Sequence, residues 1–402
     1  MEAEATTEAT TEAAATSVLV VGGGLVGLSA AMFLAGRGVE TVVVEKHPGS
    51  SPHPRAVGFT PRTMELFRAV GLGPRISQQP GGLGPPRRIR VESLAGAWFE
   101  ETLWTPDAAP ASGIEYSPCN NAAIAQDRLE PILRERAVEL GADVRLNTEL
   151  LGFEQDLSGV TASLRDRDDG SAYTLRADYL IAADGHASPI REALGIGRAG
   201  IGYLQTVRSV LFRAAFDDAL RVRLEEAGRR GFRQFTIDQP DLKAFCGTFG
   251  DGRWILMFQD DEERDEATLK AMVTKAIGRP DPGIELIANG RWKIAGLVAD
   301  RFASGRVFLA GDAAHALPGC VRNGTRGVAV GCRRQRETGP AADQAAASSA
   351  RTAAHRPWNR CRRSASETRS PDRVAARKYW RCSSKAEQKR AADTKLPKPR
   401  MG

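Results

Sequence analysis

Short apolar runs that end at glycine or at an acidic residue form the strongest pattern in this chain of 402 residues. Residues 17–27, 178–185 and 305–315 share this form, and the first of these segments contains no charged residue. Strands buried on both faces of a parallel sheet appear as continuous apolar runs, whereas half-exposed strands alternate. The pattern therefore predicts an α/β fold in which parallel strands bring three distant segments to one site.

The first run leads into a glycine-rich turn with the spacing G-x-G-x-x-G at Gly22, Gly24 and Gly27. The first glycine permits a tight turn, the second lets the backbone approach a pyrophosphate, and the third lets helix and strand pack closely. We expect a helix to follow, with its N-terminal N–H groups facing phosphate. The next run, residues 41–44, ends in Glu45, whose carboxylate can accept hydrogen bonds from ribose hydroxyls. A glycine-rich turn that binds no nucleotide is the alternative, and Glu45 in register argues against it.

The glycine motif is common to NAD and FAD sites, and the segment after Glu45 indicates which of the two dinucleotides is bound. Residues 51–67 form a loop with two arginines that runs into an amphipathic helix. This stretch resembles the segment of class A flavin monooxygenases, of the p-hydroxybenzoate hydroxylase type, that carries arginine beside the flavin. It is most similar to the branch that hydroxylates aromatic polyketides. The resemblance implies that Arg55 lies on the flavin side of the active site, and Arg55 is our candidate both for cofactor binding and for catalysis.

Three further matches extend this resemblance over residues 17 to about 318. Asp184 and Gly185 resemble the DG motif, which in the family contacts both FAD and the NADPH pyrophosphate. Gly311 and Asp312 resemble the GD motif, whose aspartate holds the ribityl chain of the flavin. The family also places a glutamine against the FAD, and Gln126 matches that position.

Both acid–glycine pairs also have a local interpretation. The first is a common turn dipeptide, and Asp312 could be the N-cap of a helix beginning near Ala313. The order of the pairs, each after an apolar run, favours the cofactor interpretation. His186 and His315 follow the two pairs, and we assign neither a catalytic role because a lone histidine there is more often a packing or capping residue.

The resemblance implies an FAD-dependent, NAD(P)H-using monooxygenase acting on an aromatic substrate, polyketide or phenolic. In that family NAD(P)H reduces the flavin, O₂ adds at C4a, and the hydroperoxide transfers one oxygen atom to an electron-rich ring, while the protein orients the reactants and excludes water. Two alternatives stay open. One is another flavoprotein oxidoreductase of the same fold, such as a reductase, halogenase or cyclase. The other is a non-catalytic remnant or a binding protein with a basic tail.

A second group of runs, rich in Val, Ile, Phe and Trp and separated by Gly or Asp, predicts an antiparallel sheet. In the family this sheet roofs the flavin and receives the aromatic substrate. Five apolar side chains are pocket candidates, each with core packing as the alternative. The runs are residues 87–99, 208–216, 232–237, 244–249 and 253–258, and the candidates are Phe235, Phe245, Trp254, Met257 and Phe258.

The predicted organisation is an FAD-binding, doubly wound (GR2-type) parallel-sheet domain with an inserted antiparallel-sheet substrate domain. Residues 1–16, an Ala/Thr/Glu tract with neither a basic n-region nor an apolar core, are expected to be a disordered tail and not a signal peptide. No membrane span is predicted, and we expect a cytoplasmic protein. The FAD-binding parts are residues 17–80, 118–198 and 296–319, and the substrate parts are residues 81–117 and 199–295.

Composition changes abruptly in residues 320–402. This segment has 21 Lys plus Arg against six Asp plus Glu, whereas residues 1–319 have 35 against 43, so the formal net charge of +7 combines two unlike parts. With four Val, one Leu, one Met and no Ile or Phe, the segment has too few apolar groups to offset ordering entropy, and we expect disorder. Four of the six cysteines lie there, without zinc or disulfide spacing.

Two interpretations of this basic segment compete. A flexible cationic chain could bind nucleic acid or an anionic surface, but the segment has no recognition module and no regular aromatic interleaving. The second interpretation is a loss of the coding frame near Pro318, because Arg-, Ala-, Ser- and Cys-rich sequence is typical of out-of-frame GC-rich DNA. We favour frame loss, which would impair flavin binding because the family continues there with a glycine-rich loop and a helix beneath the flavin.

Overall fold

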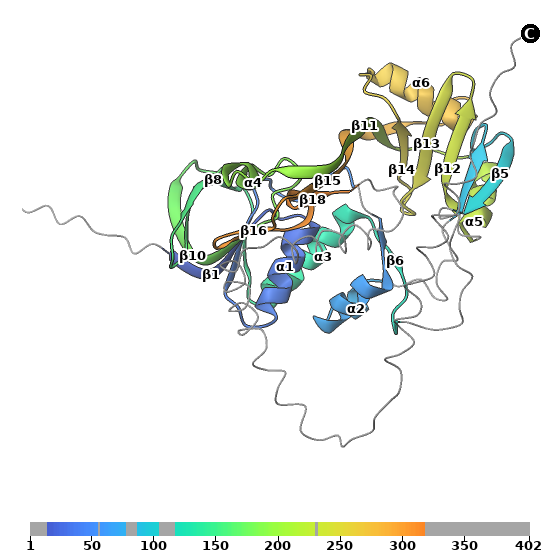
Figure 1. Ribbon diagram of the computed structural model, residues 1–402. Helices are drawn as coiled ribbons and strands as arrows, with labels where there is room; N and C mark the ends of the chain where they lie inside the picture. The colour runs from blue at the N-terminus through green and yellow to red at the C-terminus, as the bar shows by residue number, and fades with distance from the viewer. Residues whose placement is uncertain (1–13, 55–56, 78–86, 104–116, 230–231, 318–402) are drawn as a thin grey trace, which may run out of the picture. The chain divides into compact units, whose positions relative to one another are not determined.

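A computed structural model describes residues 14–54, 57–77, 87–103, 117–229 and 232–317 (Figure 1). Arg55 and the basic segment 320–402 therefore lie outside the described residues. The helices are α1 (Leu25–Ala35), α2 (Pro61–Ala69), α3 (Gln126–Glu139), α4 (Pro189–Ala193), α5 (Asp218–Arg229) and α6 (Glu266–Ile277), with 3₁₀ turns η1 (Gly73–Arg75) and η2 (Gly311–Ala313).

The first sheet contains the predicted parallel strands in the order β16-β17-β10-β1-β2-β7, with β8 and β9 continuing from β10 as an antiparallel meander. Strands β17, β10, β1, β2 and β7 are mutually parallel neighbours, so their carboxyl ends lie at one edge. The strands are β1 (Ala14–Val21), β2 (Thr41–Val44), β7 (Asp143–Arg145), β8 (Thr148–Gln155), β9 (Val160–Asp166), β10 (Ala172–Ala182), β16 (Ala303–Ser304) and β17 (Val307–Leu309).

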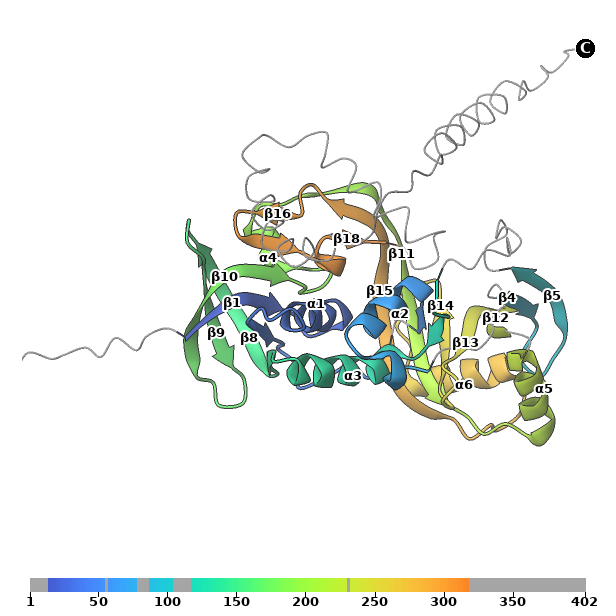
Figure 2. The ribbon, with the colours of Figure 1, turned by 90° about the horizontal axis from the view of Figure 1, so that it is seen from below.

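Apolar side chains cover both faces of this sheet. Val18 and Val20 of β1 pack with α1 and α3, which lie side by side in both views (Figures 1 and 2). Leu19 and Val21 point to the other face and pack with residues of β9 and β10. Successive side chains of a strand point to opposite faces, so a strand buried on both faces needs the uncharged run that the sequence shows. The predicted strand over residues 41–44 is confirmed, and all four of its residues are buried.

The expected end of the N-terminal tail at residue 16 is wrong. Strand β1 begins at Ala14, and the backbone of Ala14 to Thr16 pairs with Leu175 to Ala177 of β10. Strand β10 is long enough to offer these extra positions, so backbone pairing extends the strand into a tract that composition alone marks as polar. Residues 1–13 lie outside the described part of the chain.

The second sheet, of strand order β18-β15-β11-β14-β13-β12-β4-β5, contains every run predicted for the substrate domain. A separate pair, β3 (Gly58–Phe59) with β6 (Ala122–Ala123), completes the described strands. The strands of the second sheet are β4 (Arg87–Val91), β5 (Trp98–Leu103), β11 (Arg198–Arg213), β12 (Phe232–Gln239), β13 (Leu242–Thr248), β14 (Trp254–Phe258), β15 (Glu285–Ala299) and β18 (His315–Ala316).

Two details of this sheet differ from the expectation. Strands β4 and β12 pair in parallel, so the sheet is not wholly antiparallel. The long chain segment between β4–β5 and β12 makes a parallel pairing possible, and composition cannot reveal direction. Strand β15 also continues to Ala299, past the expected domain boundary at residue 295, and pairs with β11 along its length (Figure 1).

One face of the second sheet is a closed core. Val210, Phe212, Phe235 and Leu256 pack against residues of α5 and α6, such as Val273. Alternation therefore turns the neighbouring residues of the same strands to the opposite face. No helix in the described ranges is long and apolar enough to cross a lipid bilayer.

Candidate functional site

The predicted motifs converge at the carboxyl edge of the parallel sheet. The N–H of Gly22 donates to Val44 O at 2.8 Å, and the N–H of Ala183 donates to Val21 O at 2.8 Å. The N–H of Ala310 donates to the last residue of β10 at 2.9 Å. The residues that follow β1, β2, β10 and β17 therefore meet, as the carboxyl ends of parallel strands do in nucleotide-binding α/β folds.

The glycine loop is built by contact between backbone atoms. Gly22 has φ +110°, and a Cβ there would overlap the carbonyl oxygen of Ala183. A Cβ on Gly27 would overlap the carbonyl oxygen of Gly22, so only glycine lets α1 pack this closely on β1. Gly24 is the N-cap of α1, and a Cβ there would meet only Glu130 Oε1, at 3.7 Å. Protein packing thus requires glycine at the first and third motif positions and leaves space at the second.

Glu45 is held against this loop. Its Oε2 accepts the N–H of Gly23 at 2.7 Å, and its Oε1 accepts the N–H of His47 at 3.0 Å. His47 Nδ1 lies 2.6 Å from the same Oε1. The carboxylate is oriented beside the first turn of α1, with its side chain 15% exposed. The contact between His47 and Glu45 was not predicted, although a polar residue two positions after an acid can reach its carboxylate.

Asp184 organises the turn after β10. Its Oδ1 accepts the hydroxyl of Ser188 at 2.7 Å, and its Oδ2 accepts the N–H of Ile190 at 3.2 Å. Ser188 is fully buried and in turn caps α4 by accepting the N–H of Arg191 at 3.1 Å. Gly185 has φ +85°, which favours glycine. The local turn interpretation is therefore correct for the backbone, and the same turn lies at the sheet edge where the other motifs meet.

Gly311, which precedes Asp312, lies against the first turn of α1. Gly311 has φ +60°, and its Cβ would come within 2.7 Å of Val26 Cγ2. The helix considered near Ala313 is absent from the described residues: η2 is a 3₁₀ turn capped by Ala310, and β18 follows it directly. Asp312 is not an N-cap there, because pairing of the following residues with β15 replaces the helix.

Gln126 joins the site from another element. It is the first residue of α3, and its Nε2 donates to Glu130 Oε1 at 2.8 Å. Glu130 is 3% exposed and lies under Gly24, so this pair reaches the glycine loop. Glu130 was not predicted as a site residue. Its signal is an acidic residue one helical turn after Gln126 on a face that is otherwise apolar.

The loop that carries Arg55 contacts the second sheet through a described neighbour. His53 Nε2 lies 2.9 Å from the hydroxyl of Ser209 on β11, and its ring meets Trp292 edge-on at 5.5 Å between centroids. Ser209 is buried, and Gly290 leaves room for the pair. This contact brings the loop to the face of the sheet that is turned away from α5 and α6.

The structure separates the five pocket candidates into two groups. Phe235, Trp254 and Phe258 belong to the core that packs on α6. Met257 lies on the opposite face, against a cluster that joins Ala125 to the second sheet. Phe245 pairs with Met257 across β13 and β14 and therefore shares its face. Core packing is thus the correct interpretation for three candidates.

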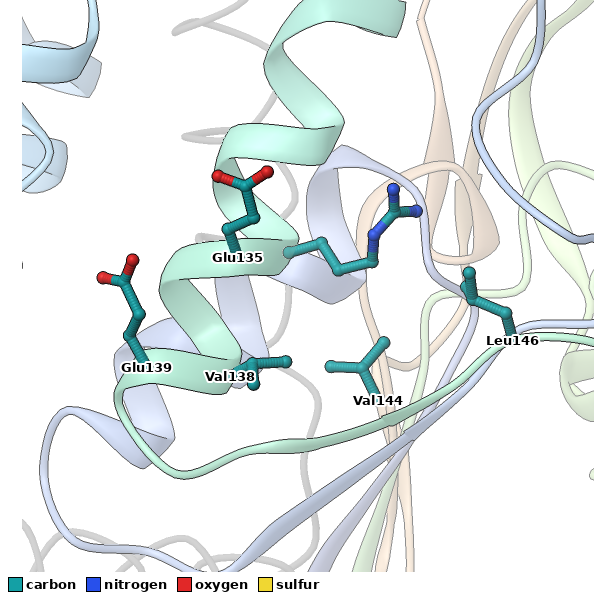
Figure 3. A pocket seen from close by; sticks show the side chains of 6 residues that line it. Glu135, Val138, Glu139, Val144 and Leu146 are labelled. Carbon is teal, nitrogen blue, oxygen red and sulfur yellow. The ribbon is translucent and has the colours of Figure 1, made fainter.

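A separate hollow beside the parallel sheet is lined by none of the predicted cofactor-binding residues. Figure 3 shows it between the outer face of α3 and β7, with Val138 and Val144 facing each other. Glu139 there is paired with Arg75 and Arg136. At 1.5 Å per residue, this end of α3 is roughly 20 Å from Gln126. Among the described residues, no group of three or more His, Cys, Asp or Glu side chains could hold a metal ion.

The fold and the site together define a dinucleotide-binding α/β protein with a second, largely antiparallel sheet. A profile of the FAD binding domain family matches residues 15–325, and the chain belongs to that family. This membership and the two sheets confirm the predicted fold class for the described residues.

Curated relatives match the same region. The chain is 39% identical over 311 residues to a putative polyketide hydroxylase of Streptomyces halstedii, covering 75% of this chain and 54% of that protein. It is 38% identical over 337 residues to the tetracenomycin A2 monooxygenase-dioxygenase of Streptomyces glaucescens, covering 77% and 59%. The chain thus spans little more than half the length of these relatives.

Solved structures of flavin-dependent enzymes are also similar to this chain. A ternary complex of aklavinone-11 hydroxylase with FAD and aklavinone superposes with a TM-score of 0.66 at 37% identity, covering 79% of this chain and 60% of that one. The flavin-dependent monooxygenase PieE, in complex with FAD and substrate, superposes with a TM-score of 0.67 at 30% identity, covering 76% and 54%.

Proposed function

We propose that this chain is an FAD-dependent, NAD(P)H-using monooxygenase that hydroxylates an aromatic polyketide or a related phenol. The observation that carries the proposal is the convergence of Glu45, the glycine loop, Asp184 and the Gly311–Asp312 pair at one edge of the sheet. Relatives named as polyketide hydroxylases and monooxygenases support the reaction class. No described feature favours a reductase, halogenase or binding protein over this function.

The residues present fit the dinucleotide. Gly22 and Gly27 set the loop, and Gly24 leaves the backbone open at the N-terminus of α1, where N–H groups and the helix dipole favour phosphate. Glu45 would accept hydrogen bonds from the adenosine ribose. Asp312 would hold the ribityl chain, with Gln126, Asp184, Gly185 and Gly311 as further cofactor contacts. Arg55, outside the described residues, stays a prediction for the flavin side of the active site.

The cofactor, when bound, supplies the redox chemistry that takes hydride from NAD(P)H and activates O₂. The protein binds and orients the reactants and excludes water. The sheet face that carries Phe245 and Met257 is suited to a planar apolar ring. Gln234 points to the same side, because Phe235 next to it enters the core, and its buried Oε1 has no hydrogen-bond partner in the described structure. An aromatic substrate with a hydroxyl donor would satisfy that atom.

The absorption spectrum of the purified protein tests the cofactor, and NADPH consumption with and without a polycyclic phenol tests the reaction. After addition of FAD we expect bound-flavin absorption, release of that FAD on heating, and NADPH oxidation that rises when the phenol is added. Glu45→Ala, which removes the ribose contact, should bind the added FAD more weakly. Failure to bind added FAD would contradict the cofactor assignment, and oxidation indifferent to every phenol would favour another oxidoreductase.

The basic segment 320–402 bears on how active the chain is. The family match ends at residue 325, close to the position where the composition changes. Frame loss near Pro318 stays our prediction, and with it a weak affinity for the flavin ring. Translating the neighbouring reading frame of the DNA tests this prediction. Stop codons without a glycine-rich loop would rule frame loss out.

A further inference from the structure

A buried arginine connects the second sheet to the helix that carries Gln126. Arg253 lies between β13 and β14, with its side chain only 6% exposed. Its guanidinium donates to both oxygens of Asp127, at 2.7 and 3.2 Å. It also donates twice to Oδ2 of Asp251, at 2.9 and 2.6 Å. Two carboxylates therefore bind one guanidinium in the fork geometry that arginine favours.

The charges of this cluster balance. Arg128 Nε lies 4.0 Å from Asp127 and 3.9 Å from Asp251, so two cations face two anions. Burial alone would raise the pKa of Asp251, but the hydrogen bonds from Arg253 hold that pKa below its usual range. Loss of Arg253 would leave the two carboxylates facing only the largely exposed Arg128 among the described residues, whereas loss of Asp127 would leave Arg253 paired with Asp251 but would break its bonds to α3.

Asp127 connects this cluster to the candidate cofactor site. Asp127 directly follows Gln126 in the first turn of α3. Gln126 bonds to Glu130, and Glu130 lies under Gly24 of the glycine loop. A continuous set of contacts therefore leads from the β13–β14 turn to the loop that is expected to hold the pyrophosphate.

The β13–β14 turn also borders the face of the second sheet that is turned away from α5 and α6. Phe249 and Ile255, on either side of the turn, form a cluster with Ala125, the N-cap residue of α3. The guanidinium of Arg253 lies 5.4 Å from the Phe249 ring centroid. One arginine thus contacts an aromatic residue of this face and a carboxylate of the cofactor-side helix.

We propose that Arg253 is a positioning residue that, through Asp127, fixes the first turn of α3 and so holds the Gln126–Glu130 pair against the cofactor. The cofactor part of this inference rests on the proposed function, since it takes FAD as the ligand of Gln126. The link between Arg253 and α3 rests on the contacts alone. Its test therefore needs one measurement without cofactor and one with it.

Arg264 provides a matched control. Its side chain is 8% exposed, it bonds to both oxygens of Asp260 at 2.9 Å, and it stacks 4.6 Å from the Phe258 ring centroid. Arg264 thus resembles Arg253 in burial, pairing and aromatic contact. Its partners within the described ranges, however, are Asp260, Glu262 and Phe258, which belong to β14 and the loop after it and not to α3.

The first experiment follows hydrogen exchange in the cofactor-free protein for residues 122–132. We expect Arg253→Met and Asp127→Asn to accelerate exchange there by about tenfold, because a hydrogen bond to a charged group is lost. Arg264→Met should leave that segment at the wild-type rate. Asp127→Asn is the milder variant and decides the outcome if Arg253→Met does not fold. Wild-type exchange in both variants would overturn the proposal.

The second experiment measures FAD affinity by fluorescence titration of the same variants. We expect a dissociation constant roughly tenfold higher for Arg253→Met and for Asp127→Asn, and no further rise in the double variant, because both act through one contact. Faster exchange with unchanged FAD affinity would overturn the positioning role. If the wild-type protein binds no FAD, the proposed function and the cofactor part both fail, while the exchange result still decides the link to α3.

Discussion

The two sheets of this protein carry their functional residues in different ways. At the edge of the parallel sheet, Gly22 and Glu45 directly follow a strand and Gly311 follows one after a single intervening residue, so a short stretch of sequence determines both the strand and the candidate site residue. In the second sheet, neighbouring residues such as Met257 and Phe258 have opposite environments. The comparison shows that a site at strand ends is visible in sequence, whereas a site on a sheet face depends on which elements cover each side.

The largest expected effect tests the two faces of the second sheet. Phe258→Ala should lower the free energy of unfolding by about 3–5 kcal/mol, because a buried ring is removed from the core. Met257→Ala, on the opposite and partly exposed face, should cost about 1–2 kcal/mol and instead weaken binding of a polycyclic phenol. Urea denaturation and phenol titration measure the two effects. Equal losses of stability would contradict the assignment of faces.

The next effect tests the strand-end site. Gly27→Ala should destabilise the fold by about 3 kcal/mol, because the new methyl group overlaps the carbonyl oxygen of Gly22 and overpacking forces backbone shifts. Gly38→Ala is the control: it has φ +75° but nothing within 4 Å of the added carbon. That variant should cost only the strain of its conformation, about 1–2 kcal/mol. Thermal or urea unfolding distinguishes them, and an equal cost would indicate that close packing of α1 is unimportant.

The third effect concerns the ligand and not the fold. Glu45→Ala should raise the FAD dissociation constant by roughly 30-fold, equivalent to about 2 kcal/mol, through loss of a charged hydrogen-bond acceptor. Glu40→Ala is the control, because Glu40 is exposed and lies directly before the strand that leads to Glu45. Titration of both variants checks the prediction. An unchanged affinity in Glu45→Ala would remove Glu45 as the ribose ligand.

The contrast between the strand-end site and the sheet face also explains how much the sequence could predict. Gly22, Gly27 and Glu45 could be singled out because their spacing along the chain, directly after apolar runs, marks them. The contact of Glu130 with Gly24 and the Arg253–Asp127 pair could not, because each joins residues more than 100 positions apart that meet only when α3 packs.

The errors have equally physical causes. Parallel pairing of β4 with β12 was missed because composition does not encode strand direction. The helix considered after Asp312 was replaced by pairing of His315 with Val298 of β15, a tertiary contact that overrides the local capping signal. The sequence was therefore reliable where neighbouring residues determine the local structure, and less so where a distant strand determines the conformation.

The smallest expected effect concerns the rim of the second sheet, which is held by surface charge. Hydrogen bonds from Arg291, assisted by Arg208, lower the pKa of Asp261 to about 2. A carboxyl group whose pKa is lowered in the folded state stabilises the protein above its unfolded pKa, near 3.9. That contribution is lost as the pH falls through about 2, because the acid becomes protonated in both states.

Asp261→Asn should therefore be slightly less stable than the wild type at pH 6, and the difference should disappear below pH 2. Because Asp261 is at the surface, added salt should also reduce the difference. Unfolding curves from pH 6 to about pH 1 measure it, and a difference that persists undiminished at the lowest pH would show that Asp261 acts through packing and not through its charge.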